Sequence, residues 1–136
     1  MIKKILLVLG AGIFLAACSK QQGVVHGTTS DGKQIVQMAE KNGSKQMGSA
    51  TIGPDNGKMR VLVSLNSPNG SITQPASIVL GTCDAPADVK FALADAKGGV
   101  SDTHLETDWN TIGGLAVAVF KSPDDPKTMV ACGMIQ

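Results

Sequence analysis

Short apolar stretches separated by turn-forming residues follow one another along most of the chain, at a spacing of about ten residues. Apolar side chains recur at every second position in residues 59–65 and 115–119, as expected when one face of a strand packs on a core. The stretches that we expect to form strands read KQIVQMA, GSATIG, KMRVLVSL, ASIVL, VKFALAD, SDTHLETDW, LAVAVFK and KTMVACGMI. Such spacing predicts an all-β fold, an antiparallel Greek-key sandwich or barrel of about seven or eight strands.

The turns between these stretches carry signals of their own. Asn56-Gly57, within GPDNGK, tolerates the positive φ of a two-residue hairpin turn and should join SATI to MRVLVSL. Asp124 and Asp125, flanked by prolines, predict a polar turn before the last strand. Leu62, Ala116 and Ala118 are apolar although they occupy the outward positions of their stretches. This indicates that the outer faces of these strands are partly covered. No helix longer than a turn or two is expected.

The first residues carry a targeting signal. Lys3 and Lys4 precede an apolar run over residues 5–15, which is too short to cross a bilayer as a helix and is typical of a secretory signal peptide. The following Leu15-Ala16-Ala17-Cys18 resembles the lipobox of bacterial lipoproteins. That resemblance implies a signal peptide over residues 1–17 and a diacylglyceryl thioether plus an N-acyl chain on Cys18, which together hold a protein stably on its membrane.

Ser19 stands where the inner-membrane retention signal of lipoproteins would be Asp, so the resemblance implies the outer membrane, periplasmic face. Residues 18–29 are rich in Gln, Gly and Ser and are expected to form a tether, and residues 30–136 a single β domain. Removing the signal peptide leaves ten basic against eleven acidic residues. With this balance, no Tyr and one Trp, the chain lacks the groups that bind nucleic acid.

With Cys18 given to lipid, Cys83 and Cys132 remain. A secretory compartment favours a disulfide between them. It would close a loop of about fifty residues, for which the chain-entropy relation gives roughly 4 kcal/mol of stabilisation. The alternatives are a shared metal site and two free thiols, but no histidine lies at ligand spacing from either cysteine, which makes a zinc site the poorer interpretation.

The chain from Gly48 to Ile135 contains GSATI, PASIVLGTC, AVAVFKSPDD and VACGMI in this order. These segments resemble the copper/zinc superoxide dismutase fold, and more closely the small secreted CHRD-like domains of that superfamily. The resemblance implies a superoxide dismutase-like sandwich, in which three copper-ligand histidines would fall on Ser77, Val79 and Phe120. None of these residues supplies an imidazole nitrogen, so we expect no metal, no cofactor and no dismutase activity.

Other residues with metal-binding chemistry have simpler interpretations. His104 should share a strand face with Asp102 and Glu106, either as a weak surface metal site or, as we favour, as a solvated face. His26 falls in the expected tether. The mature methionines could bind Cu(I) if they converged, but their dispersal favours core filling: Met38, Met47, Met59, Met129 and Met134.

The sequence therefore predicts a lipid-anchored periplasmic lipoprotein with a non-catalytic β domain, which serves as a binding or envelope-structural module. Its expected partners are the membrane, through lipid on Cys18, and an envelope protein, and the oligomeric state is left open. Two alternatives remain. One is a copper- or metal-handling lipoprotein that uses His104, methionines and acidic residues, and the other is a lysozyme-inhibitor-like lipoprotein of similar size and address.

Overall fold

The computed structural model describes residues 27–29, 31–66 and 72–136, and these form an antiparallel all-β fold, which confirms that part of the prediction. The strands are β1 (Gly27–Thr28), β2 (Gln34–Glu40), β3 (Gly48–Asp55), β4 (Lys58–Leu65), β5 (Thr73–Gln74), β6 (Ala76–Gly81), β7 (Pro86–Ala92), β8 (Ala96–Lys97), β9 (Val100–Leu105), β10 (Ala116–Ser122) and β11 (Asp125–Met134). They make one continuous sheet in the order β5-β8-β9-β4-β3-β2-β11-β10-β6-β7, and β1 pairs with β2 outside this path.

The expected count of seven or eight strands is wrong for the described part of the chain. Ten strands follow one another along the sheet, and β1 adds to them. Each of the eight expected stretches contains a strand, and the three others, β1, β5 and β8, are two residues long. A two-residue bridge is too short to show an alternating pattern, so the hydrophobic periodicity carries no sign of it. β1 also takes up the last residues of the expected tether.

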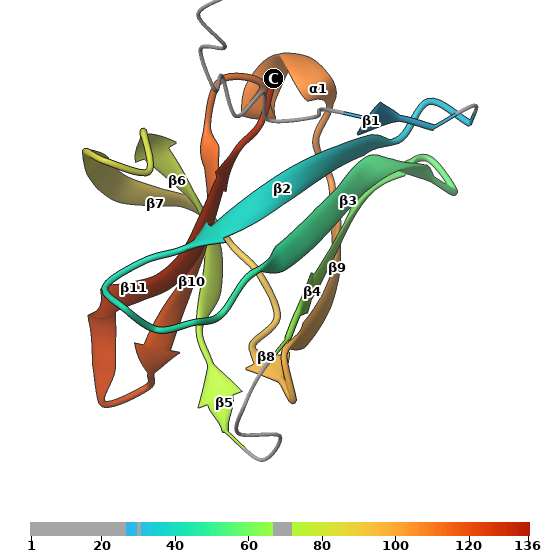
Figure 1. Ribbon diagram of the computed structural model, residues 1–136. Coiled ribbons are helices and arrows are strands. Elements are labelled where there is room, and N and C mark those ends of the chain that lie inside the picture. The colour runs from blue at the N-terminus through green and yellow to red at the C-terminus, as the bar shows by residue number, and fades with distance from the viewer. Residues whose placement is uncertain (1–26, 30, 67–71) are drawn as a thin grey trace, which may run out of the picture.

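The sheet bends so that its two halves face each other across a core. Figure 1 shows β3, β4 and β9 on one side, β6, β10 and β11 on the other, and β2 passing between them. The buried apolar side chains of this core come from both halves and include Val36, Met38, Ala50, Ile52, Val61, Val63, Ile78, Val117, Val119 and Ala131. A smaller cluster, which includes Ala116 and Ala118, lies on the outer face of β10, as the sequence predicted.

A local signal in the sequence accounts for the β3–β4 hairpin, and a short helix follows β9. Asn56 and Gly57 have φ of 51° and 77° and connect β3 to β4, which confirms the predicted two-residue turn. The helix α1 (Trp109–Ile112) buries Ile112 completely and packs Trp109 against the core. In the described part of the chain, no helix has the length and the apolar character needed to cross a membrane.

Cys83 and Cys132 form a disulfide, with an S–S distance of 2.06 Å and 49 residues between them in sequence. The bond confirms the favoured interpretation of these two cysteines. Cys132 is buried in β11, and Cys83 follows β6 at the start of the segment that leads into β7. The disulfide therefore fastens the β6–β7 connection to β11, the strand that joins this half of the sheet to β2.

We expect Cys132→Ser to lower the melting temperature of the mature protein by roughly 15 °C, because the loss of the cross-link removes about 4 kcal/mol of chain-entropy stabilisation. The melt can be followed by the fluorescence of Trp109. A thiol reagent should then label Cys83, and the wild type in reductant should melt close to the variant. An unchanged melt in reductant would show that the bond contributes no stability.

β2 and β11 join the two halves, and their contact depends on a glycine. Ala131 pairs with Glu40 and Cys132 with Ala39 across this junction. A Cβ atom on the neighbouring Gly133 would lie 2.4 Å from the carbonyl oxygen of Gln37 and 2.6 Å from Cγ1 of Val36. Both distances are far inside van der Waals contact, so any side chain at Gly133 would push β2 away from β11.

Gly133→Ala should therefore destabilise the domain by about 2–3 kcal/mol through overpacking at the junction. Denaturant unfolding of the two proteins measures this difference. Gly113→Ala is the matched control, because Gly113 has a φ of −57° and its added Cβ would come no closer than 3.2 Å to another atom. Equal losses in the two variants would contradict a special role of the β2–β11 contact.

Candidate functional site

The structure brings together two of the three positions that the resemblance assigns to lost metal ligands. Val79, on β6, and Phe120, on β10, line the same surface hollow of about 390 Å³, which β7 borders with Val89. Ser77 lies on the same face of β6 as Val79 but outside this hollow. Val79 is buried, and Phe120 packs against the same outer cluster. The side chains of both are hydrocarbon, so neither can ligate a metal.

Two of the residues that sequence singled out lie outside the described residues. These are Cys18, the expected site of lipidation, and His26. Within the described ranges, no group of three or more His, Cys, Asp or Glu residues is close enough to hold a metal ion.

His104 belongs to a row of charged pairs across β3, β4 and β9. Its Nε2 lies 2.9 Å from Oδ2 of Asp55. Arg60, which lies opposite His104 in the register of β4 and β9, donates two hydrogen bonds to the carboxylate of Asp102, of 2.9 and 2.6 Å. His104 and Asp102 thus share a face of β9 as predicted, and each side chain contacts a residue of another strand. Glu106, the third residue expected on this face, follows the end of β9 and pairs with Lys58 at 2.9 Å.

These contacts lower the pKa values of the carboxyl groups. The hydrogen bond from His104 lowers the pKa of Asp55, and that from Arg60 lowers the pKa of Asp102. Near the start of β2, Thr29 and Lys33 lower the pKa of Asp31 to about 2. Because each folded-state pKa lies below its unfolded value, the corresponding stability is present above the unfolded pKa and is lost as the pH falls through the folded one.

We expect the melting temperature to fall as the pH is lowered from about 5 to about 2, since the unfolded carboxyls, with pKa near 3.9, bind protons more readily than the folded ones. Asp102→Asn should make this fall shallower. At pH 7 it should cost less than about 1 kcal/mol, because both partners of the pair are more than a third exposed to solvent.

Asp88→Asn is the matched control, because Asp88 lies on the exposed strand β7 and has no ion pair with a described residue. Its acid melting curve should parallel that of the wild type. If Asp102→Asn gave the same parallel curve, the Arg60 pair would have no part in acid stability.

The methionines are dispersed rather than gathered around a point. Met38 and Met59 are buried in the central core, and Met129 in the outer cluster. Met134 packs against the outer cluster, while Met47 is 49% exposed. Core filling is thus confirmed for the three buried methionines.

A site that sequence reasoning missed lies at the end of the sheet away from α1. Here the β2–β3 connection, β5 and the β10–β11 hairpin surround a pocket of about 250 Å³. We call it the polar pocket, and its described lining residues are Lys41, Asn42, Ser44, Gln46, Ile72, Gln74, Lys121, Thr128 and Val130. Most of these side chains are amides, hydroxyls or amines, and no described carboxylate is among them.

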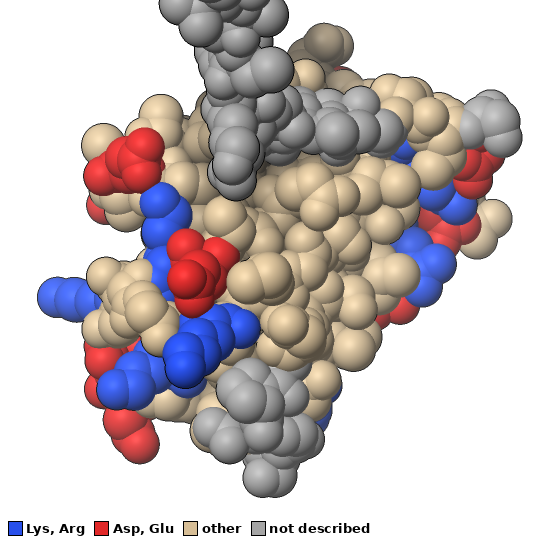
Figure 2. All heavy atoms as spheres, in the orientation of Figure 1, with Lys and Arg blue, Asp and Glu red and all other residues tan. Residues whose placement is uncertain are grey.

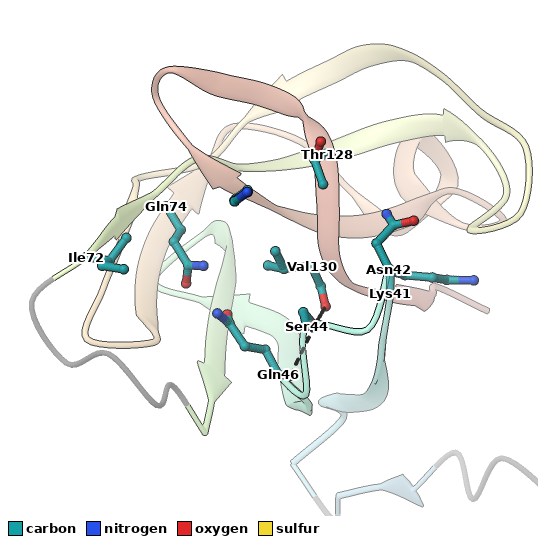
Figure 3. A pocket seen from close by; sticks show the side chains of 9 residues that line it. Lys41, Asn42, Ser44, Gln46, Ile72, Gln74, Thr128 and Val130 are labelled. Carbon is teal, nitrogen blue, oxygen red and sulfur yellow. Dashed lines mark hydrogen bonds between the residues drawn. The ribbon is translucent and has the colours of Figure 1, made fainter.

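Two glutamines dominate the interior of the polar pocket. Gln46 and Gln74 retain only 7% and 1% of their exposure to solvent. Figure 3 shows their side chains extending toward one another from opposite sides of the pocket. Yet neither Oε1 atom has a hydrogen-bond partner among the described residues. A buried carbonyl without a partner costs about 1–3 kcal/mol, so this pocket has two polar groups that would gain from a bound hydrogen-bond donor.

The wall beside Gln46 is fixed by hydrogen bonds to β11. Ser44 donates from Oγ to the carbonyl oxygen of Val130, at 2.5 Å, and Asn42 donates from Nδ2 to that of Met129, at 2.9 Å. Lys45, in the same connection, has a φ of 60°, a backbone conformation uncommon for a residue other than glycine. Strain of this kind persists where surrounding contacts determine the backbone, and it is frequent at binding sites.

Charge at the polar pocket is positive. Lys41 and Lys121 line it, and Nζ of Lys41 lies 2.9 Å from Oδ1 of Asp84, outside the pocket. Lys121 has no ion pair with a described residue. Figure 2 shows that charged groups gather toward the two sides of the view, while the surface over β2 and β3 between them is mostly uncharged. The pocket thus offers neutral polar groups inside and, on its wall, the ammonium of Lys121, which makes no direct ion pair with a described residue. Besides the hydrogen bond from Thr128, the charge of this ammonium helps to lower the pKa of Asp125 in the same hairpin.

The burial of the two glutamines in this pocket could have been predicted from their alternation with apolar residues in the sequence. Gln74, Ala76 and Ile78 occupy alternate positions, and the latter two point into the core. Gln46 likewise continues the inward row of Ala50 and Ile52 back beyond the start of β3. A glutamine in phase with buried alanine and isoleucine is a candidate for a buried polar group.

No protein-family model, no curated protein and no solved structure matches the chain.

Proposed function

We propose that this protein is a lipid-anchored lipoprotein of the bacterial envelope whose disulfide-closed β domain is a non-catalytic binding module. The observation that carries the proposal is the pair of buried glutamine carbonyls in the polar pocket, which have no hydrogen-bond partner in the described part of the chain. Amide and hydroxyl side chains recognise a ligand by hydrogen bonds, and they do not exchange protons near neutral pH. A pocket built from them is suited to binding rather than to acid–base chemistry.

The lipid anchor rests on the signal-like residues 1–17 and on Cys18, and Ser19 favours the periplasmic face of the outer membrane as its place. Cys18 is nine residues from Gly27 in sequence, and a fully extended chain of that length spans at most about 30 Å. In Figure 1, β1 lies at the α1 end of the domain, and β5 and the β10–β11 hairpin lie at the other end. An anchored domain could thus present the polar pocket on the side away from its membrane.

The domain itself we assign to the superoxide dismutase-like, CHRD-like sandwiches without their metal site. What supports this is the common hollow of Val79 and Phe120, positions far apart in sequence that the resemblance places at one metal centre. The Cys83–Cys132 disulfide is the second feature that the resemblance and the structure share. In this proposal the scaffold has been kept, and binding has moved from the former metal centre to the polar pocket.

Cys18→Ser should move the protein from the membrane fraction to the soluble fraction and abolish labelling by palmitate, because one thioether carries the anchor. Cell fractionation and metabolic labelling measure the two effects. Ser19→Ala is the matched control and should leave both unchanged. A variant that kept its membrane association and its label would contradict the anchor at Cys18.

The non-catalytic part has a separate test. Protein equilibrated with copper and zinc and then dialysed should retain less than one equivalent of either metal and consume no superoxide, since Ser77, Val79 and Phe120 offer no imidazole. Metal content by mass spectrometry and a superoxide assay are the readouts. One retained equivalent would instead favour the metal-handling alternative.

A further inference from the structure

The polar pocket has a chemistry specific enough to indicate its ligand. We propose that it binds a small hydroxylated acid, such as a single sugar acid, with the hydroxyl groups on Gln46 and Gln74 and the acid group toward Lys121. This inference rests on the proposed binding function and adds the class of ligand to it.

The glutamines require a partner that donates hydrogen bonds. Each primary amide offers an acceptor oxygen and two N–H donors, and the two oxygens are fully buried with no hydrogen-bond partner among the described residues. A hydroxyl group both donates and accepts, so it satisfies such an amide in either of its two orientations. Two facing amides, as Figure 3 shows them, therefore match neighbouring hydroxyls on one molecule better than they match a single donor.

The charge on the wall decides between neutral and charged donors. An ammonium group could also donate to the glutamine oxygens, but Lys41 and Lys121 line the same pocket and no described carboxylate does. A buried cation without a counter-charge is costly, which favours neutral hydroxyls as donors. The same lysines favour an acid group elsewhere on the ligand, and Lys121 is the better partner because Lys41 is paired with Asp84.

The space and the remaining wall fit one small ring. A volume of about 250 Å³ equals that of about eight water molecules in the liquid, more than a few buried waters would fill. Ile72 and Val130 add aliphatic surface to the polar groups. A sugar ring presents C–H faces as well as hydroxyls, so it can use both kinds of surface at once.

The test is a titration of the mature lipoprotein in detergent micelles with D-glucuronate, D-glucose, acetate and glycine, followed by NMR. We expect saturable shifts of the side-chain amide signals of Gln46 and Gln74 with glucuronate, and weaker binding of glucose. Acetate, which lacks the hydroxyls, and glycine, which brings an ammonium, should bind least. Lys121→Gln should reduce the affinity for glucuronate to about that for glucose, while Lys90→Gln on β7 should not.

Gln74→Met should weaken glucuronate binding roughly tenfold or more, because it removes the polar end of a side chain of similar length. In the free protein the same change should raise the melting temperature, since an unpartnered buried carbonyl is lost. Loss of binding in a more stable variant could not come from unfolding. Gln37→Met, on an exposed part of β2 outside the pocket, is the matched control for both measurements.

The outcomes separate this inference from the proposed function. Equal binding of glucose and glucuronate, or best binding of glycine or acetate, would overturn the hydroxylated acid while leaving a binding pocket. Unchanged binding in Gln74→Met would place the ligand elsewhere and overturn the inference as well. If none of the four compounds shifted the amide signals, the pocket would hold ordered water only, and both the ligand class and the pocket's binding role would fall.

Discussion

The close contact of β2 with β11 is the constraint on which the rest of the molecule depends. β2 pairs with β3 on one edge and with β11 on the other, so this strand alone turns two half-sheets into one bent sheet. Its backbone can approach only because Gly133 has no side chain. The central core exists because the halves are held face to face at this junction, and a wider separation would open it to water.

The polar pocket is a consequence of the same bend. Its wall comes from the β2–β3 connection, β5 and the β10–β11 hairpin, which meet only because the halves face each other. The inward rows of β3 and β5–β6 bury apolar side chains until they reach this end, where Gln46 and Gln74 continue them. The burial of those amides is therefore imposed by the apolar residues in phase with them. Because the Oε1 atoms of both amides have no partner among the described residues, their burial costs stability in the free protein.

The sequence allowed much of the fold to be predicted but little of the site. Alternation located the eight longer strands, and Asn56-Gly57 located a hairpin, because both signals are local. The two-residue strands have no periodicity, and the pairing of β2 with β11 joins residues almost a hundred positions apart, which no local pattern encodes. The resemblance marked Ser77, Val79 and Phe120 because they lack the imidazoles expected at their positions. Nothing marked Gln46 and Gln74, because glutamine is usually exposed. Only their alternation with buried apolar residues indicates that these two are buried.

The disulfide and the pocket wall are connected through one short segment. Residues 41–44 are held to β11 at the carbonyl oxygens of Met129 and Val130, three and two residues before Cys132. On their other side, Lys41 contacts Asp84, which follows Cys83. The disulfide thus holds together the two strand regions to which this wall is fastened, and a wall fixed in advance loses little freedom when a ligand binds. In the binding function proposed for the polar pocket, the cross-link would support recognition as well as stability, although both cysteines lie outside the pocket.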